Sequence, residues 1–254
     1  MNVTPIIFQD AMVRALLKGR KTQTRRVVKP QLEWLDKKPF FGAWGYRRGK
    51  QYLHVGGDYH PDGWERIKAG CPYGKPGDLL WVREAWHSPK KCLAGYDGMN
   101  GPDCGWRRDR NLVIYREGAW YQEGRFVANH PKGDPERWIP SIHMPRWASR
   151  LTLRLTDVRV ERVQAISEED AKAEGAPLAH FGEAFEVPDI FSGWGWFPDR
   201  AHHYGFQGLW DSINGPRGFG WDANPWVWVL EFDVIPKNVD AVFQDDPETA
   251  MEGR

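Results

Sequence analysis

Residues 19–26 constrain this chain more than any other stretch. They read Gly-Arg-Lys-Thr-Gln-Thr-Arg-Arg, which places one lysine, two hydroxyls and three arginines within seven residues. Packing such a cluster inside a core is costly, because every buried charge needs a partner. The stretch therefore lies at the surface as a solvated basic turn, or it lines a polar pocket.

A short helical pattern leads into this cluster. Apolar side chains recur at helical spacing in residues 10–17, Asp10 stands where it can cap the start, and Gly19 can close the end. The sequence therefore predicts a helix and then a turn that delivers the basic residues.

Composition excludes several classes of protein. With 35 Lys+Arg against 34 Asp+Glu, the formal net charge is +1, so any basic partner surface must be local. Three cysteines, an odd number, give no disulfide framework and favour a reducing compartment. Because neither a signal peptide nor an apolar stretch of about 20 residues is visible, we expect a soluble cytoplasmic protein without membrane contact.

Periodicity predicts helices and strands in an irregular order. We expect strands around 6–8, 79–86, 149–163 and 225–235, and helices over 10–17, 167–175 and 201–214. The apolar parity of the third strand shifts between Leu155 and Val158, which predicts a bulge or bend near Asp157. Because strands and helices do not alternate as in a βαβ protein, the predicted fold class is α+β.

The remaining segments are predicted to be loops or a tail. Residues 1–235 are expected to form a single domain with two loop-rich insertions, near 30–76 and 87–140. Within the second insertion, 112–115 and 120–127 are candidate short strands joined by a turn at 117–118. Residues 236–254, where acids outweigh bases, are expected to form a disordered tail.

Four segments together resemble the pattern of one family. Residues 16–26 carry a basic motif, 77–84 a Gly-Asp pair and a strand, 158–175 a long strand and a helix, and 226–232 a closing strand. This arrangement is similar to that of ASCH domains, a branch of the PUA-like superfamily, and to larger phage and prophage ASCH proteins. The resemblance implies a PUA-like β-pseudo-barrel with flanking helices.

The resemblance also implies a chemistry. Similar small ASCH proteins are N4-acetylcytidine amidohydrolases, in which a lysine accepts a proton, a threonine three residues later is the nucleophile, and a glutamate on a later helix donates a proton. In this chain the three roles fall on Lys21, Thr24 and Glu174. Apart from the resemblance, Glu174 would be a solvated carboxylate in the last turn of its helix.

Physical chemistry sets conditions on this assignment. A threonine hydroxyl needs a neighbouring base, and Lys21 can serve only when neutral. Lowering its pKa from about 10.4 to about 7.5 requires roughly 4 kcal/mol of destabilisation of the cation. Burial and the like charges of Arg20, Arg25 and Arg26 act in that direction, although the same cluster equally fits a phosphate clamp with a charged Lys21. A regular strand would point positions 21 and 24 to opposite faces, so a turn or bulge is required.

Six further residues are candidates for substrate binding: Arg26, Trp81, Arg83, Glu84, His143 and Arg146. Trp81 offers a plane on which a base can stack. Glu84 is a second candidate for the acid, or else the partner of Arg83 in an orienting ion pair. His143 and Arg146 belong to a Pro-rich segment, 138–147, of a kind that often lies across a pocket mouth.

Neither a metal nor a cofactor is predicted. Cys71, Cys92 and Cys104 include no Cys-x-x-Cys pair, and no Gly-rich phosphate loop is present. The leading hypothesis is therefore an amidohydrolase that removes the N4-acyl group from a modified cytidine or cytosine nucleoside.

The alternative is a non-catalytic RNA- or nucleotide-binding module that depends on Arg25 and Arg26; a nuclease ranks third, because no metal-binding carboxylate cluster is visible. The expected partner is a modified nucleoside or nucleotide, or RNA. The oligomeric state stays open.

Overall fold

The computed structural model describes residues 1–31, 71–87, 138–177 and 200–245, together with short segments at 43–47, 50–54, 64–65, 90–92, 106–108, 112–116, 119–122 and 125–128. Contacts divide the chain into two compact units. Unit 1 comprises Met1–Leu17, Asp78–Arg154 and Val234–Arg254, and unit 2 comprises Lys18–Gly77 and Leu155–Asp233.

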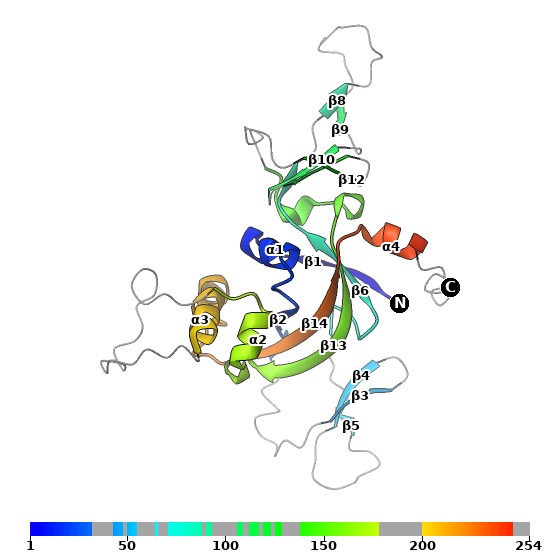
Figure 1. Ribbon diagram of the computed structural model, residues 1–254. Coiled ribbons are helices and arrows are strands. Elements are labelled where there is room, and N and C mark those ends of the chain that lie inside the picture. Colours follow the sequence, from blue (N-terminus) through cyan, green and yellow to red (C-terminus); the bar gives the residue numbers. More distant parts are fainter. Residues whose placement is uncertain are drawn as a thin grey trace, which may run out of the picture. The chain divides into compact units, whose positions relative to one another are not determined.

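A five-stranded mixed sheet contains the longest strands (Figure 1). Its order is β1 (Val3–Ile7), β6 (Leu79–Arg83), β13 (Thr152–Arg162), β14 (Trp226–Ile235) and β2 (Gln23–Val27). β1 and β6 are parallel, whereas β6 pairs with β13 and β14 with β2 in antiparallel fashion. The mixed α+β class is thus confirmed. Among the described strands β1 and β2 are edges, so the sheet is not a closed barrel.

Unit 1 packs helices α1 (Asp10–Leu17) and α4 (Val239–Asp245) with β1 and β6. The predicted helix over 10–17 is confirmed. The predicted strand over 79–86 is shorter, because pairing in β6 stops at Arg83 and β7 (Trp86–His87) joins another sheet. The prediction of a tail from residue 236 is wrong for the described part: α4 buries Val239 and Val242 against Leu79. Residues 246–254 lie outside the described residues.

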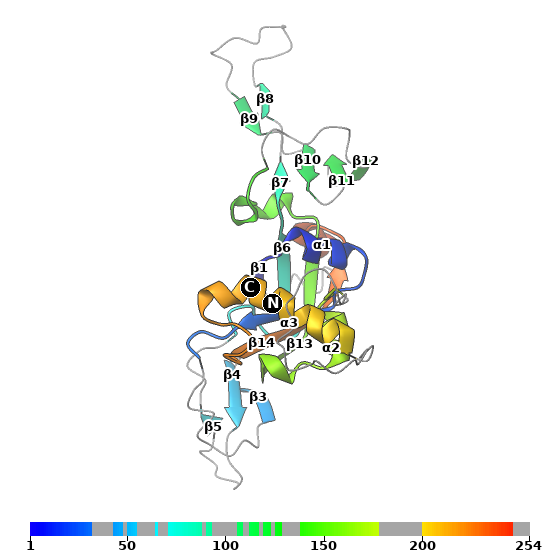
Figure 2. The same cartoon turned by 90° about the vertical axis from the view of Figure 1, so that its left-hand side faces the viewer.

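Short strands build the rest of unit 1 (Figure 2). β7 continues into a sheet with β10 (Leu112–Tyr115), β11 (Ala119–Gln122) and β12 (Arg125–Ala128), and β8 (Lys90–Cys92) pairs with β9 (Trp106–Arg108). The strand over 112–115 is confirmed, whereas the one over 120–127 is two strands. The turn at 117–118 lies outside the described residues. The Pro-rich segment forms two 3₁₀ turns, Ser141–His143 and Arg146–Ala148, the second of which ends one residue beyond position 147.

Unit 2 packs α2 (Glu168–Ala173) and α3 (Ala201–Asn214) beside β2, β13 and β14. Both predicted helices are confirmed. Their shared core consists of Val163, Ile166, Ala171, Ala176, Phe206, Trp210, Trp221, Val227 and Val229. Burial along β13 changes parity between Leu155 and Val158, as the sequence predicted.

A small sheet in unit 2 lies in the segment predicted to be irregular. It contains β3 (Ala43–Arg47), β4 (Lys50–His54) and β5 (Trp64–Glu65). Each strand has five residues or fewer, which is too short for a period of two to stand out from the surrounding Gly and Pro. None of the helices in the described part of the chain has the length and apolar character of a membrane span.

Candidate functional site

The basic cluster begins where α1 ends. Gly19 adopts φ +65°, a left-handed conformation that other residues rarely take, and it turns the chain out of the helix. Gly19 and Arg20 are exposed, but Lys21 is fully buried. Because β2 begins only at Gln23, Lys21 precedes the strand, so the strict alternation of strand faces does not apply between it and Thr24.

Lys21 is bound at the C-terminus of α2. Its Nζ donates to the Glu174 carboxylate (Oε2, 2.5 Å) and to the Glu174 carbonyl (2.7 Å). The Thr22 N–H donates to the Ala173 carbonyl at 2.8 Å. A cation at a helix C-terminus is favoured by the dipole, and these bonds satisfy carbonyls that the helix leaves open. Glu174 caps α2, and the next residue, Gly175, turns the chain away with φ +72°.

Burial has the largest effect on the Lys21 amine and lowers its pKa from the ordinary 10.5. The charge and hydrogen bond of Glu174 oppose this change, while Arg26 and Arg25 reinforce it. Arg20 is exposed and has no part in it. The pKa of Lys21 thus changes in the direction that a base requires.

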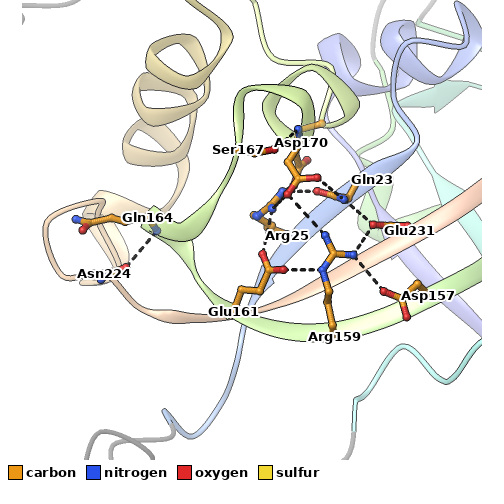
Figure 3. Close-up of polar contacts among 11 residues, drawn as sticks. Gln23, Arg25, Asp157, Arg159, Glu161, Gln164, Ser167, Asp170, Asn224 and Glu231 are labelled. Carbon is orange, nitrogen blue, oxygen red and sulfur yellow. Dashed lines mark hydrogen bonds and ion pairs between the residues drawn. The ribbon is translucent and has the colours of Figure 1, made fainter. Parts of the chain in front are cut away.

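Arg25 lies in the network of Figure 3. Its Nη2 donates to Asp170 at 2.9 Å and to Glu161 at 3.3 Å, and its Nη1 donates to Gln23. The guanidinium carbon lies 5.9 Å from the centre of the Phe206 ring. Arg25 is 3% exposed, so its charge is neutralised inside the protein rather than offered to a ligand.

Arg159 is the second cation in Figure 3 and ties the same network to the strands. It donates to Asp157 at 3.1 Å, to Glu161 at 2.6 Å and to Glu231. Burial alone would lower the pKa of Arg159, but the hydrogen bonds to Glu161 and Glu231 outweigh it and raise the pKa. Arg159 is therefore always charged and holds β13 and β14 together.

Thr24 alternates with Gln23 and Arg25 along β2, opposite Leu230 of β14. It is 1% exposed, so its hydroxyl lies inside the protein. Arg26 follows Arg25 in the strand. Burial lowers the pKa of Arg26, Tyr73 and Glu174 oppose that effect, and Arg217 adds to it. Arg26 thus shares the electrostatic environment of Lys21 and Glu174.

Two buried polar atoms at this site are incompletely satisfied. Within the described residues, Glu174 Oε1 and Arg25 Nε have no hydrogen-bond partner. Arg25 Nη1 lies 3.7 Å from Glu174 Oε1. Since unpaired buried polar groups are costly, such atoms often serve function rather than stability.

The candidate residues of unit 1 have structural partners. Glu84 is buried and bound bidentately by Arg150, with Nε–Oε1 at 2.9 Å and Nη2–Oε2 at 2.8 Å. The ion pair that the structure shows for Glu84 is thus formed with Arg150. Arg150 also lies 4.1 Å from the centre of the Tyr115 ring. This closed arrangement makes Glu84 a weak candidate for the acid.

Three of the other residues predicted to bind substrate in unit 1, Trp81, Arg83 and Arg146, are also engaged by the protein. Trp81 is 9% exposed and packs in a core with α4, so its ring offers little surface for stacking. Arg83 lies over that ring and donates to the Ile142 carbonyl. Arg146 pairs with Asp240 at 2.6 Å, whereas His143 is exposed.

No group of three metal-binding side chains occurs in the described part of the chain. Cys71 is described, and burial raises the pKa of its thiol to about 11, whereas Cys104 lies outside the described residues. The sequence marks Asp170 only as part of a helix start, whereas the structure places it at the site, four positions before Glu174. The signal was present: an acid at the third helical position after Ser167, as in a capping box.

Comparison with known proteins does not identify this site. No model of a known protein family matches the chain, and neither a curated protein nor a solved structure matches it. Function is therefore inferred from the residues of unit 2 that surround Lys21.

Proposed function

We propose that this chain is an amidohydrolase that removes the N4-acyl group from a modified cytidine or cytosine nucleoside. Thr24 is the nucleophile, Lys21 the base and Glu174 the acid. The observation that carries the proposal is the buried Lys21–Glu174 pair, held at 2.5 Å, with the buried Thr24 three positions after Lys21 in the chain. The motif around these residues supports an ASCH-like, PUA-like fold as part of the same proposal.

The short bond between Lys21 and Glu174 suggests how one pair supplies both an acid and a base. Burial lowers the pKa of the Lys21 amine, which favours movement of the shared proton along this bond. With the shared proton on Glu174, the Lys21 amine takes the Thr24 proton as Oγ attacks the acyl carbonyl. Glu174 then protonates N4 as the amide bond breaks, releasing the cytosine amine.

Deacylation uses the same roles again, with water in place of Thr24 as the attacking group. The acyl group is now an ester of Thr24, the proton received by Lys21 restores the ammonium, and transfer back to Glu174 regenerates the base. Lys21 then accepts a proton from the attacking water, and the Thr24 hydroxyl leaves with a proton from the pair. The cycle consumes one water and releases a carboxylic acid.

Acyl release from N4-acetylcytidine tests the proposal. We expect Lys21→Ala, Thr24→Ala and Glu174→Gln each to lower kcat by about 10²- to 10⁴-fold. Thr24→Ser should retain part of the activity because it keeps the hydroxyl. Thr22→Ala is the matched control, since that side chain is exposed in the same motif. Equal rates in all variants, or no turnover of a panel of acyl cytidines, would contradict the proposal.

The RNA- or nucleotide-binding alternative receives less support from the site. It requires Arg25 and Arg26 to meet phosphates, but the Arg25 guanidinium is buried against Asp170, Glu161 and Gln23. The exposed Arg20 remains available to an anionic partner, so the alternative would shift to that residue.

A further inference from the structure

Helix α2 presents two acids one turn apart to the cations around β2. Asp170 and Glu174 are separated by four residues and therefore share a face. The Ser167 hydroxyl accepts from the Asp170 N–H at 3.0 Å, which is half of a capping box. The Asp170 carboxylate does not complete the box. Instead it accepts from Gln23 (3.2 Å) and Arg25 (2.9 Å), as Figure 3 shows.

Glu174 lies between two cations that compete for it. Lys21 holds Oε2 at 2.5 Å, whereas Arg25 Nη1 stays 3.7 Å from Oε1, beyond hydrogen-bond distance. Arginine binds carboxylates bidentately better than lysine does. Moreover, Arg25 Nε and Glu174 Oε1 are complementary atoms, both buried and both without a hydrogen bond among the described residues. Unrestrained, Arg25 would satisfy them by turning toward Glu174.

The restraint on Arg25 comes from its other partners. Asp170 holds Nη2 at 2.9 Å with an ionised oxygen, Glu161 holds the same nitrogen more weakly at 3.3 Å, and Gln23 holds Nη1. Asp170 also positions Gln23 through its second oxygen. Gln23 also donates to Glu231 at 3.0 Å, so Asp170 binds the guanidinium directly and shares the positioning of Gln23 with Glu231.

We propose that Asp170 is a positioning residue, which keeps the Arg25 guanidinium away from Glu174 so that the Glu174 carboxylate stays bonded to Lys21. The catalytic consequence rests on the proposed function, but the choice of partner by Glu174 does not. Replacing Asp170 with asparagine keeps an oxygen for Gln23 and removes the charge that binds Arg25. Arg25 is then free to form a two-point bond with Glu174, at the expense of Lys21.

The Lys21 amine reports this exchange of partners. Glu174 of α2 and Arg25 and Arg26 of β2 are the charged groups that act on it. In Asp170→Asn, Arg25 loses a neutralising anion and Glu174 is drawn away. Both changes leave Lys21 in a more positive environment, so its pKa falls.

The experiment is an NMR titration of protein carrying [ε-¹³C]lysine, with the Lys21 resonance identified by its loss in Lys21→Arg. We expect Asp170→Asn to move the Lys21 midpoint to lower pH. Asp170→Glu, which keeps the charge, should restore the midpoint toward that of the wild type. The matched control is Asp157→Asn, because Asp157 belongs to the same network but pairs with Arg159 (3.1 Å). That control should leave the midpoint unchanged.

A double-mutant cycle isolates the role of Arg25. If Asp170 acts through Arg25, the shift caused by Asp170→Asn disappears when Arg25 is already methionine. An unshifted midpoint in Asp170→Asn, or the same shift in the methionine background, would overturn the inference. A crystal structure of Asp170→Asn provides a second measurement, in which an Arg25–Glu174 separation of about 2.8 Å is expected.

Kinetics connect the inference to catalysis. Asp170→Asn should lower kcat by up to about 100-fold with little change in KM, because the acid–base pair is displaced and the substrate contacts are kept. If the wild-type protein releases no acyl group, the proposed function fails, whereas the titration still decides whether Asp170 restrains Arg25.

Discussion

At the scale of single residues, burying the Lys21–Glu174 pair carries a large free-energy cost of desolvation. Two charges taken out of water lose hydration, and their attraction offsets that loss only when the geometry is good. Here the lysine makes two short bonds to one residue, and burial still lowers its pKa. A pair of this kind adds little net stability, so its presence favours a functional role over a structural one.

The pH dependence of stability tests the lowered pKa of Lys21. In the unfolded chain Lys21 titrates near pH 10.4, and in the folded protein it titrates lower. Between these two values the unfolded state binds more protons, so the free energy of unfolding rises with pH. The charged Lys21 destabilises the folded protein in full below the folded pKa, and this destabilisation is relieved as the pH rises toward about 10.4. The expected slope is at most about 1.4 kcal/mol per pH unit.

Urea denaturation between pH 7.5 and 10.5 measures that slope. The variant Lys21→Met/Glu174→Gln removes both charges together and should lose the rise attributable to Lys21. Lys172→Met is the matched control, because Lys172 is an exposed lysine on α2. Parallel curves for the wild type and the double variant would show that Lys21 titrates normally in the folded protein.

At the scale of elements, the sequence predicted correctly those helices whose capping residues and apolar period are local. The helix over 201–214 and the helix after Ser167 agree with α3 and α2, because capping and the 3.6-residue period are local. The strands within 43–65 were missed because they are very short. Helix α4 was missed because its acidic composition resembles a tail, although Val239 and Val242 are buried.

In the candidate site, too, residues within a local motif could be predicted, whereas contacts between residues far apart in the sequence could not. Lys21, Thr24 and Glu174 stand out in the sequence through a resemblance that no comparison tests. Their surroundings could not be predicted, since Arg25 meets Asp170 across 145 positions and Arg150 meets Glu84 across 66. Such pairings depend on sheet register, which periodicity does not specify.

Helix α3 depends on an acid from a different helix. The residue before it, Arg200, provides no side-chain cap, but the Glu168 carboxylate accepts from the N–H groups of His202 (3.0 Å) and His203 (2.8 Å). These bonds replace an N-cap and place negative charge at the positive end of the helix. Glu168 thereby fastens the start of α2 to the start of α3.

Loss of this cap should destabilise unit 2. We expect Glu168→Ala to lower the free energy of unfolding by about 1–2 kcal/mol, as when an N-cap is removed. Glu169→Ala is the matched control, because Glu169 is the exposed neighbouring acid on the same helix turn. Equal stability of the two variants, measured by urea denaturation, would mean that the Glu168 hydrogen bonds to α3 do not stabilise the fold.

At the scale of the whole molecule, charge argues against general affinity for nucleic acid. The formal net charge is +1, and among the basic cluster Lys21 and Arg25 are buried and neutralised by acids. Binding to a phosphate backbone depends on cations that are free to release counterions. Within the described residues, this burial makes the basic cluster better suited to a small ligand than to a polymer, in line with the proposed function.

We therefore expect single-stranded RNA to bind more weakly than a Kd of about 10⁻⁴ M at physiological salt, the weak end of non-specific binding. Fluorescence anisotropy with a labelled oligonucleotide, at salt concentrations between about 50 and 200 mM, measures both affinity and salt slope. Tight binding that falls steeply with salt would favour the RNA-binding alternative. In that event, Arg20→Ala should reduce the slope by about one unit, because the exposed Arg20 would neutralise one phosphate, whereas buried Arg25 should act only through folding.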